Sequence, residues 1–227
     1  MVEKYLTIYE DKDAEIVIKK SRFIGTIKHV ETEDDVKIFL EEIRKKHYNA
    51  THNVFAYTVG LEQPLERCSD DGEPSGTAGM PILEVIRGEN LRNVIVVVTR
   101  YFGGTLLGTG GLVRAYSTST KEVIECANIQ QNILYYLISV TVDYTLSGKI
   151  QYEILQDSYI IYDTEYKDNV VYNILVEYDK KDIFEKKIID ITSGVAVIKN
   201  KGLYYGIHNN EQIILKQVDD KKINKKQ

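Results

Sequence analysis

The sequence from Val94 to Tyr116 reads VIVVVTRYFGGTLLGTGGLVRAY. Its first five residues are apolar on both faces of an extended chain, which is typical of a strand in the middle of a sheet. Glycines then interrupt the pattern, and from Gly110 onward Leu112, Val113 and the final tyrosine recur near helical spacing. This stretch predicts a central strand, a glycine-rich loop at its carboxyl end, and a helix that starts beside that loop.

The glycine-rich loop favours two interpretations. Backbone N–H groups of Gly103 and Gly104, and of Gly108, Gly110 and Gly111 at the helix start, could converge with the helix dipole on an anion. Arg100 and Arg114 would then supply positive charge. Alternatively, the glycines only permit tight turns and close packing. The spacing matches neither a Walker A loop nor a dinucleotide fingerprint, so a nucleotide is not implied by the pattern itself.

An acidic turn precedes the central strand, where residues 69–81 read SDDGEPSGTAGMP. Asp70, Asp71 and Glu73 could hold a magnesium ion or act as general acid and base. They could instead accept hydrogen bonds from backbone N–H groups and pair with Arg100 or Arg114, which is the interpretation we favour. We therefore expect no metal and no cofactor, although magnesium remains an alternative.

Other side chains near these motifs suggest further roles. His52 lies at the start of an expected strand, and a structural role is the simpler interpretation, although it is the first candidate if a proton is transferred. Tyr101, Phe102 and Tyr116 could stack on nucleic-acid bases beside the arginines. Packing in the core is the competing explanation, and we favour it for Phe102.

Composition limits the class of protein. The 227 residues are 43% hydrophobic, enough for a core in one large domain or two small ones. A net charge of -5 argues against capture of nucleic acid by the whole surface. No apolar run is long enough to cross a membrane, the first residues do not resemble a signal peptide, and the two cysteines lack metal-ligand spacing, so we expect a cytoplasmic protein.

Two domains are expected, residues 1–131 and 132–227, because all seven arginines precede Leu134. In the first, residues 23–30 read as a strand and Thr32 to Asp35 as a capping box that opens a helix; residues 52–59 and 81–86 read as further strands. In the second, residues 134–145, 147–155, 159–166, 170–178, 182–191 and 195–199 read as strand, helix, strand, strand, helix and strand. This βαββαβ order is ferredoxin-like, so the fold class is α+β. The lysines of the tail, Lys221, Lys222, Lys225 and Lys226, indicate a solvated end.

Together, the acidic turn and the segment from Arg100 to Tyr116 resemble the signature of the IMPACT/YigZ family. The resemblance is strong over about Ser21 to Ala127, and it implies two α+β domains similar to the last two domains of elongation factor G, the first of them similar to domain IV. Many members carry a lysine where this chain has Leu106. The resemblance implies a binding face formed by His52, Asp70, Asp71, Glu73, Thr77, Arg100, Tyr101, Gly103, Gly104, Gly108, Gly110, Gly111 and Arg114.

Eukaryotic relatives implicated in translational control carry an additional N-terminal RWD domain, for which this chain has no room. The resemblance favours a non-enzymatic, translation-linked protein whose Arg/Gly-rich face binds a phosphate of an RNA or a nucleotide, with RNA or the ribosome as partner and no membrane. The alternative is a hydrolase-like enzyme acting on a phosphorylated small molecule with His52 and the acidic turn. A protein-docking module is a third possibility.

Overall fold

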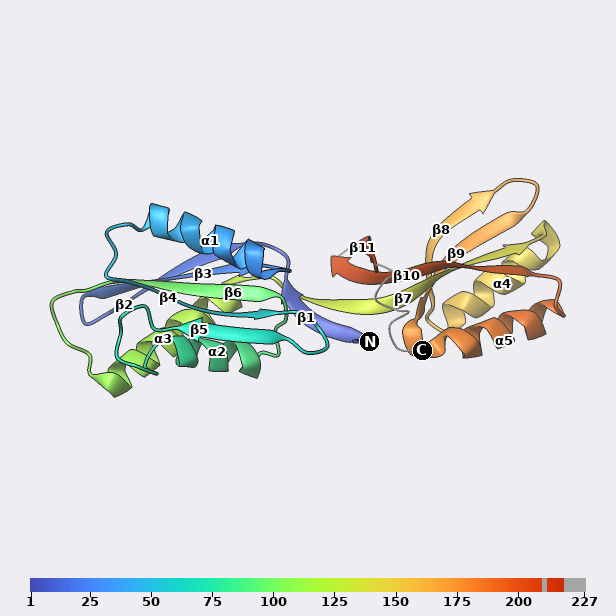
Figure 1. Cartoon of the computed structure of the whole chain (residues 1–227). Coiled ribbons are helices and arrows are strands. Elements are labelled where there is room, and N and C mark those ends of the chain that lie inside the picture. Colours follow the sequence, from blue (N-terminus) through green and yellow to red (C-terminus); the bar gives the residue numbers. More distant parts are fainter. Residues whose placement is uncertain (210–211, 219–227) are drawn as a thin grey trace. The chain divides into compact units, whose positions relative to one another are not determined.

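The computed structural model describes residues 1–209 and 212–218. The chain divides into two compact units, residues 1–131 and 132–227 (Figure 1). Each unit combines helices with a sheet, so the α+β fold class is confirmed. Within the described residues, no helix has the length and apolar character needed to cross a membrane. The four tail lysines lie outside the described residues.

The sheet of the first unit is antiparallel, with the order β2-β3-β6-β4-β5. Strand β6 (Val94–Tyr101) is central, as predicted, and its residues from 94 to 100 are all buried. The other members are β2 (Lys12–Ile18), β3 (Ser21–His29), β4 (His52–Val59) and β5 (Leu65–Ser69), and a short strand β1 (Lys4–Ile8) precedes them.

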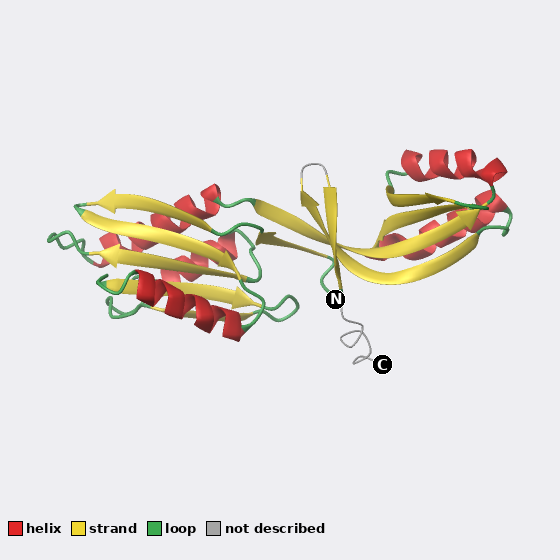
Figure 2. Ribbon diagram, turned by 90° about the horizontal axis from the view of Figure 1, so that it is seen from above, coloured by secondary structure: helices red, strands yellow, loops and turns green. Residues whose placement is uncertain are grey.

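Helices cover both faces of this sheet (Figure 2). Helix α1 (Glu33–Lys46) starts at the predicted capping box, in which the Thr32 hydroxyl and the Asp35 carboxylate accept each other's backbone N–H, and it buries Val36, Phe39, Leu40 and Ile43. Helices α2 (Gly79–Gly88) and α3 (Thr109–Cys126) cover the opposite face. Each face therefore has its own apolar layer.

The prediction of a strand at residues 81–86 is wrong, because this segment belongs to helix α2. Its buried residues Ile82, Leu83 and Ile86 have the spacing of one helix face. A short apolar run of this kind is compatible with a helix and with a strand, so the sequence pattern does not distinguish them. The deciding contact is distant in sequence: the Asp70 carboxylate accepts hydrogen bonds from the N–H groups of Ala78 and Gly79, where the helix starts. Strands β1, β2 and β5 of this unit were not predicted.

The second unit has the predicted βαββαβ order, followed by one additional strand. Strand β7 (Ile129–Val142) leads into α4 (Tyr144–Gln156), the hairpin of β8 (Ile160–Tyr166) and β9 (Val170–Glu177), and then α5 (Lys181–Thr192), β10 (Val197–Asn209) and β11 (Gln212–Gln217). Sheet order is β11-β10-β7-β9-β8. Phe184, Ile188, Ile150 and Ile154 of the two helices pack on one face of the sheet. The ferredoxin-like prediction is confirmed.

Candidate functional site

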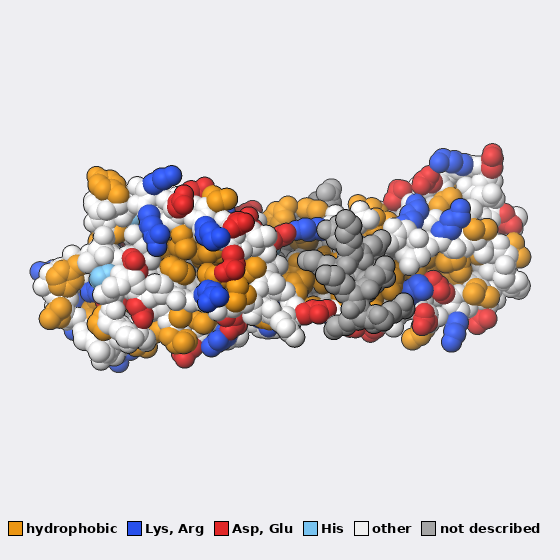
Figure 3. All heavy atoms as spheres, viewed as in Figure 1, with side chains coloured by type: hydrophobic (Ala, Val, Ile, Leu, Met, Phe, Trp, Pro, Cys, Tyr) orange, Lys and Arg blue, Asp and Glu red, His pale blue; other side chains and the backbone are white. Residues whose placement is uncertain are grey.

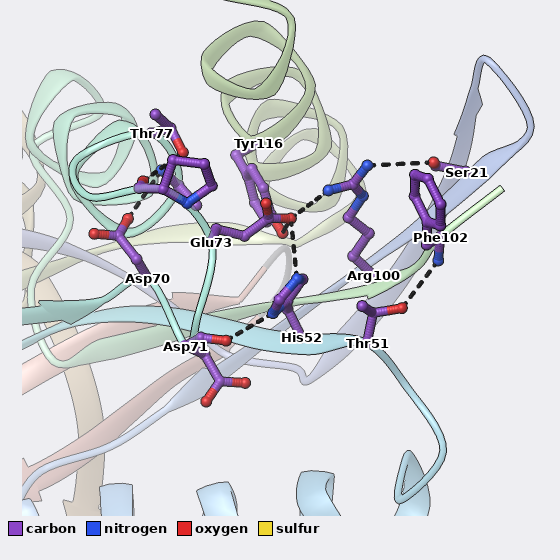
Figure 4. Close-up of polar contacts among 12 residues, drawn as sticks. Ser21, Thr51, His52, Asp70, Asp71, Glu73, Thr77, Arg100, Phe102 and Tyr116 are labelled. Atoms are coloured by element: carbon purple, nitrogen blue, oxygen red, sulfur yellow. Dashed lines mark hydrogen bonds and ion pairs between the residues drawn. The ribbon is translucent and has the colours of Figure 1, made fainter. Parts of the chain in front are cut away.

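Strand pairing brings the predicted site residues to one end of the first sheet. In the antiparallel register, Arg100 of β6 lies opposite Phe23 of β3 on one side and opposite His52 of β4 on the other. The acidic turn follows β5, and helix α3 brings Tyr116 to the same place (Figure 4). Segments that are far apart in the sequence therefore meet where the central strand ends.

A buried ion pair lies at the centre of this group. The Arg100 Nη1 atom donates to the Glu73 Oε1 atom at 2.5 Å, and the Tyr116 hydroxyl donates to the same oxygen at 2.9 Å. The two charged side chains are only 6% and 4% exposed. Burial and the adjacent Glu73 charge raise the pKa of Tyr116, so this phenol stays a neutral donor.

Aromatic rings enclose the same guanidinium. Its central carbon lies 5.3 Å from the centre of the Phe23 ring and 5.5 Å from that of the Phe102 ring. Arg100 is thus occupied by a carboxylate and two rings, as in the interpretation that ties the arginines to the acidic turn. It is not a free cation for a phosphate.

His52 is oriented by the acidic turn. Its Nδ1 atom lies 2.7 Å from the Asp71 backbone oxygen. Because a carbonyl oxygen can only accept, Nδ1 is the donor in this hydrogen bond. The Nε2 atom lies 3.8 Å from Glu73 Oε1. The ring therefore faces a carboxylate oxygen that already accepts two hydrogen bonds. This arrangement suits a histidine that holds the turn against β4.

Asp70, Asp71 and Thr77 of the turn also have partners within the protein. Asp70 accepts from the N–H groups of Gly76, Ala78 and Gly79; burial would raise the pKa of its carboxyl, but these three donors outweigh burial and lower it. Asp71 accepts from the backbone N–H of Asn53 at 2.6 Å, and the Thr77 hydroxyl donates to the Pro74 oxygen. In residues 1–209 and 212–218, no three His, Cys, Asp or Glu side chains gather as metal ligands.

The five loop glycines fall into two groups. Gly103 is packed so closely that a Cβ atom would lie 2.0 Å from the backbone carbon of Lys20, and its N–H donates to the Ser21 hydroxyl. Gly111 lies against the Leu107 side chain. In contrast, a Cβ atom at Gly104, Gly108 or Gly110 would meet no other atom within 4 Å. Helix α3 follows Gly108, which has φ of 73° and provides no side-chain cap.

Exposed positive charge surrounds this open part of the loop. Arg114 is exposed on the first turns of α3, four residues after Gly110. Because helical side chains point toward the N-terminus of their helix, we expect its side chain to lie toward Gly110 and Gly111. Lys19 and Lys20 form the exposed turn between β2 and β3. Because β3 pairs with β6, this turn lies beside Gly103. Across the described part of the chain, none of these three cations forms an ion pair or a side-chain hydrogen bond.

We call Lys19, Lys20, residues 102–111 and Arg114 the tip face. Sequence reasoning missed the two lysines, because only the pairing of β3 with β6 brings them to the loop. The sequence gives only a weak indication of their position. The two lysines separate two stretches in which apolar and polar residues alternate, a pattern that is typical of a β-hairpin.

The aromatic residues are placed differently from expectation. Tyr116 is fully buried, and Tyr101 is held by its hydrogen bond to His47 Nδ1 at 2.9 Å. Phe102, which we expected in the core, is 47% exposed, because it follows the last residue of β6 and lies on the loop. Leu106 is 84% exposed, and Figure 3 shows hydrophobic side chains at the end of the unit where this loop lies in Figure 1.

Comparison with known proteins identifies both units. Residues 19–124 match the family model described as the Impact N-terminal domain, and residues 140–195 match a domain of unknown function, DUF1949. The chain is 40% identical over 205 residues to IMPACT family member YvyE of Bacillus subtilis, covering 90% of this chain and 94% of that protein. It is 32% identical over 179 residues to IMPACT family member YigZ of Escherichia coli, covering 78% and 88%.

A solved structure agrees with these matches. The crystal structure of a hypothetical protein, 30% identical in sequence, superimposes with a TM-score of 0.58 over 87% of this chain and 97% of that chain. Both units are therefore found together in a related protein.

Proposed function

Because this chain belongs to the IMPACT family, we propose that it is a translation-linked binding protein without catalytic activity, and that its tip face recognises phosphates of an RNA. The link to translation rests on the resemblance to eukaryotic members implicated in translational control. The proposed contact with RNA rests on the exposed, unpaired cations of the tip face.

The observation that carries this proposal is the unpaired positive charge of the tip face. Lys19, Lys20 and Arg114 are exposed beside a loop whose Gly104, Gly108 and Gly110 leave open space for a ligand. Other exposed cations of the first unit pair with carboxylates, namely Arg22, Lys37, Lys46, Arg67 and Arg87. Arg44, Lys45 and Lys121 are exposed and form no ion pair among the described residues, but they do not belong to the glycine-rich loop or to the turn beside it. A protein of net charge -5 needs such a local concentration of unpaired cations to hold a polyanion.

Arg100 has a supporting role in this proposal. Its bond to Glu73 and its contacts with two rings hold the acidic turn, β6 and the start of the glycine loop together. We therefore assign contact with phosphate to Arg114 and the two lysines, and assign Arg100 to positioning the loop.

The alternative, a hydrolase-like enzyme, requires a carboxylate or an imidazole that is free to act on a substrate. In the described residues, Asp70, Asp71 and Glu73 all accept hydrogen bonds from the protein, and His52 faces a carboxylate that is already engaged. This geometry favours the binding protein.

Binding of a labelled RNA hairpin with a single-stranded tail would test the proposal. We expect Arg114→Gln and the double variant Lys19→Gln/Lys20→Gln to weaken binding, because each removes contacts with phosphate. Lys186→Gln is the matched control, since it removes one exposed positive charge from α5 of the second unit. Equal affinity of the wild type and the tip variants would overturn the proposal.

A further inference from the structure

We propose that the tip face binds an unpaired nucleotide and that Phe102 is the surface on which its base stacks. This inference rests on the proposed function and deepens it, because it selects single-stranded RNA over duplex RNA as the ligand.

Contacts within the protein support the Phe102 ring in an exposed position, where a base could stack on it. The Arg100 guanidinium lies over the ring, 5.5 Å from its centre, and Glu73 binds that guanidinium on the side away from Phe102 (Figure 4). The Phe23 ring lies 5.3 Å from the same guanidinium carbon. The Phe102 backbone N–H donates to the Thr51 hydroxyl at 3.1 Å, which anchors the first residue of the loop to the segment before β4. The ring is supported from within the protein, yet 47% of the residue remains exposed.

The charges around the ring match a nucleotide better than an apolar partner. The Lys20 backbone adjoins Gly103, the residue after Phe102, and the exposed Arg114 follows Gly110 by one helical turn at the end of the loop. A base on the ring would have a phosphate on either side, within a surface that carries three unpaired cations. Stacking on an aromatic ring together with cations along the backbone is how single strands are bound.

A duplex does not fit this arrangement. In double-stranded RNA the bases are already stacked on each other, so proteins contact its shape, its 2′-hydroxyls and its phosphates. Away from the ends of a duplex, a single ring on a loop can stack only on a base that has left the helix. The other two aromatic candidates do not extend the stack, because Tyr116 is buried and Tyr101 is bonded to His47. We therefore expect one stacked base.

The absence of tryptophan from the chain allows a direct test. Phe102→Trp places the sole tryptophan on the tip, and a stacked base should quench its fluorescence. The probe is a short single-stranded oligoribonucleotide, compared with the same strand annealed to its complement. Tyr152→Trp is the control, because Tyr152 is exposed on α4 and lies outside the tip face. Its fluorescence measures the quenching that RNA causes without binding specifically at the tryptophan. We expect saturable quenching of Phe102→Trp by the single strand and only the control level with the duplex.

Affinity measurements complete the test. Loss of stacking in Phe102→Leu should weaken binding of the single strand by about 5- to 150-fold and leave binding of the duplex unchanged, whereas Phe102→Tyr should retain the wild-type affinity. Thermal unfolding at the wild-type temperature would show that Phe102→Leu is folded.

The outcomes separate the two proposals. If Arg114→Gln weakens binding but Phe102→Leu does not, and tryptophan at position 102 is not quenched, the tip binds phosphates and the stacking inference is wrong. If neither the single strand nor the duplex binds, both proposals are wrong.

Discussion

The Glu73 carboxylate connects three elements through one oxygen atom. Arg100 of β6 and Tyr116 of α3 both donate to it, and His52 of β4 faces it. A buried arginine without this carboxylate would be an uncompensated charge, which costs more than the ion pair itself contributes. Glu73 therefore matters because it neutralises Arg100 inside the unit.

Replacement of Glu73 by Gln should lower the free energy of unfolding of the first unit by about 3 kcal/mol, because the Arg100 charge would remain buried without a counterion. Urea denaturation would measure this change. The double variant Glu73→Leu/Arg100→Met should recover part of the loss, since it removes both charges. A cost below about 1 kcal/mol for Glu73→Gln would show that the pair is not structurally important.

Asp70 gives a prediction about acid stability. The pKa of its carboxyl is lower in the folded protein than in the unfolded chain, because three backbone donors outweigh burial. The stability that Asp70 contributes is therefore fully present above the ordinary aspartate pKa of about 4 and is lost as pH falls through the lower, folded-state pKa.

We expect Asp70→Ala to lower the unfolding temperature at pH 7 and to reduce the dependence of that temperature on pH below about 4. The loss at pH 7 should correspond to about 1–2 kcal/mol, as for a helix N-cap. Calorimetry across this pH range would measure both. Asp34→Ala is the control, because Asp34 is 83% exposed. If both variants showed the wild-type pH profile, Asp70 would not have this role.

At the scale of elements, the sequence predicts what local patterns determine. The capping box at Thr32, the apolar run of β6 and the βαββαβ order of the second unit all follow from spacing within a few residues. The strand expected at residues 81–86 is a helix whose start is held by Asp70, an interaction across the turn that no local pattern reveals.

In the candidate site, too, some features follow from local sequence patterns and others depend on contacts between distant segments. The glycines and Arg114 can be recognised in the sequence, but Lys19 and Lys20 join them only through the pairing of β3 with β6. Whether Arg100 is free or paired, and whether Phe102 is buried or exposed, depends on the positions of Glu73 and of the end of β6. Contacts between distant segments therefore decide which of the candidate residues a ligand can reach.

Two loop glycines should respond in opposite ways to substitution. Gly110→Ala should raise the stability of the first unit by about 0.5–1 kcal/mol, because alanine favours the helix and the methyl group meets no atom. It should nevertheless weaken RNA binding, since that methyl occupies space beside Arg114. Gly103→Ala should cost about 3 kcal/mol, because its Cβ would overlap the Lys20 backbone. Thermal unfolding and RNA titration would test both, and unchanged RNA affinity of Gly110→Ala would argue against an RNA contact there.

For the molecule as a whole, charge restricts where RNA can bind. The chain has a pI of about 5.5, and acidic and basic side chains are mixed on the face drawn in Figure 3. All arginines lie in the first unit, where the tip face carries three cations that are unpaired among the described residues. RNA binding by this protein should therefore involve few phosphates and depend on the tip face alone.

The salt dependence of RNA binding would show whether the tip face holds the phosphates of an RNA. For the wild type, we expect the logarithm of the binding constant to fall linearly with the logarithm of salt concentration, with a slope of about -2, or about -0.7 for each of three phosphate contacts on a single strand. Lys186→Gln should keep this slope, and the triple variant Lys19→Gln/Lys20→Gln/Arg114→Gln should bring it close to zero. The same slope for the wild type and the triple variant would contradict the claim that the tip face binds RNA.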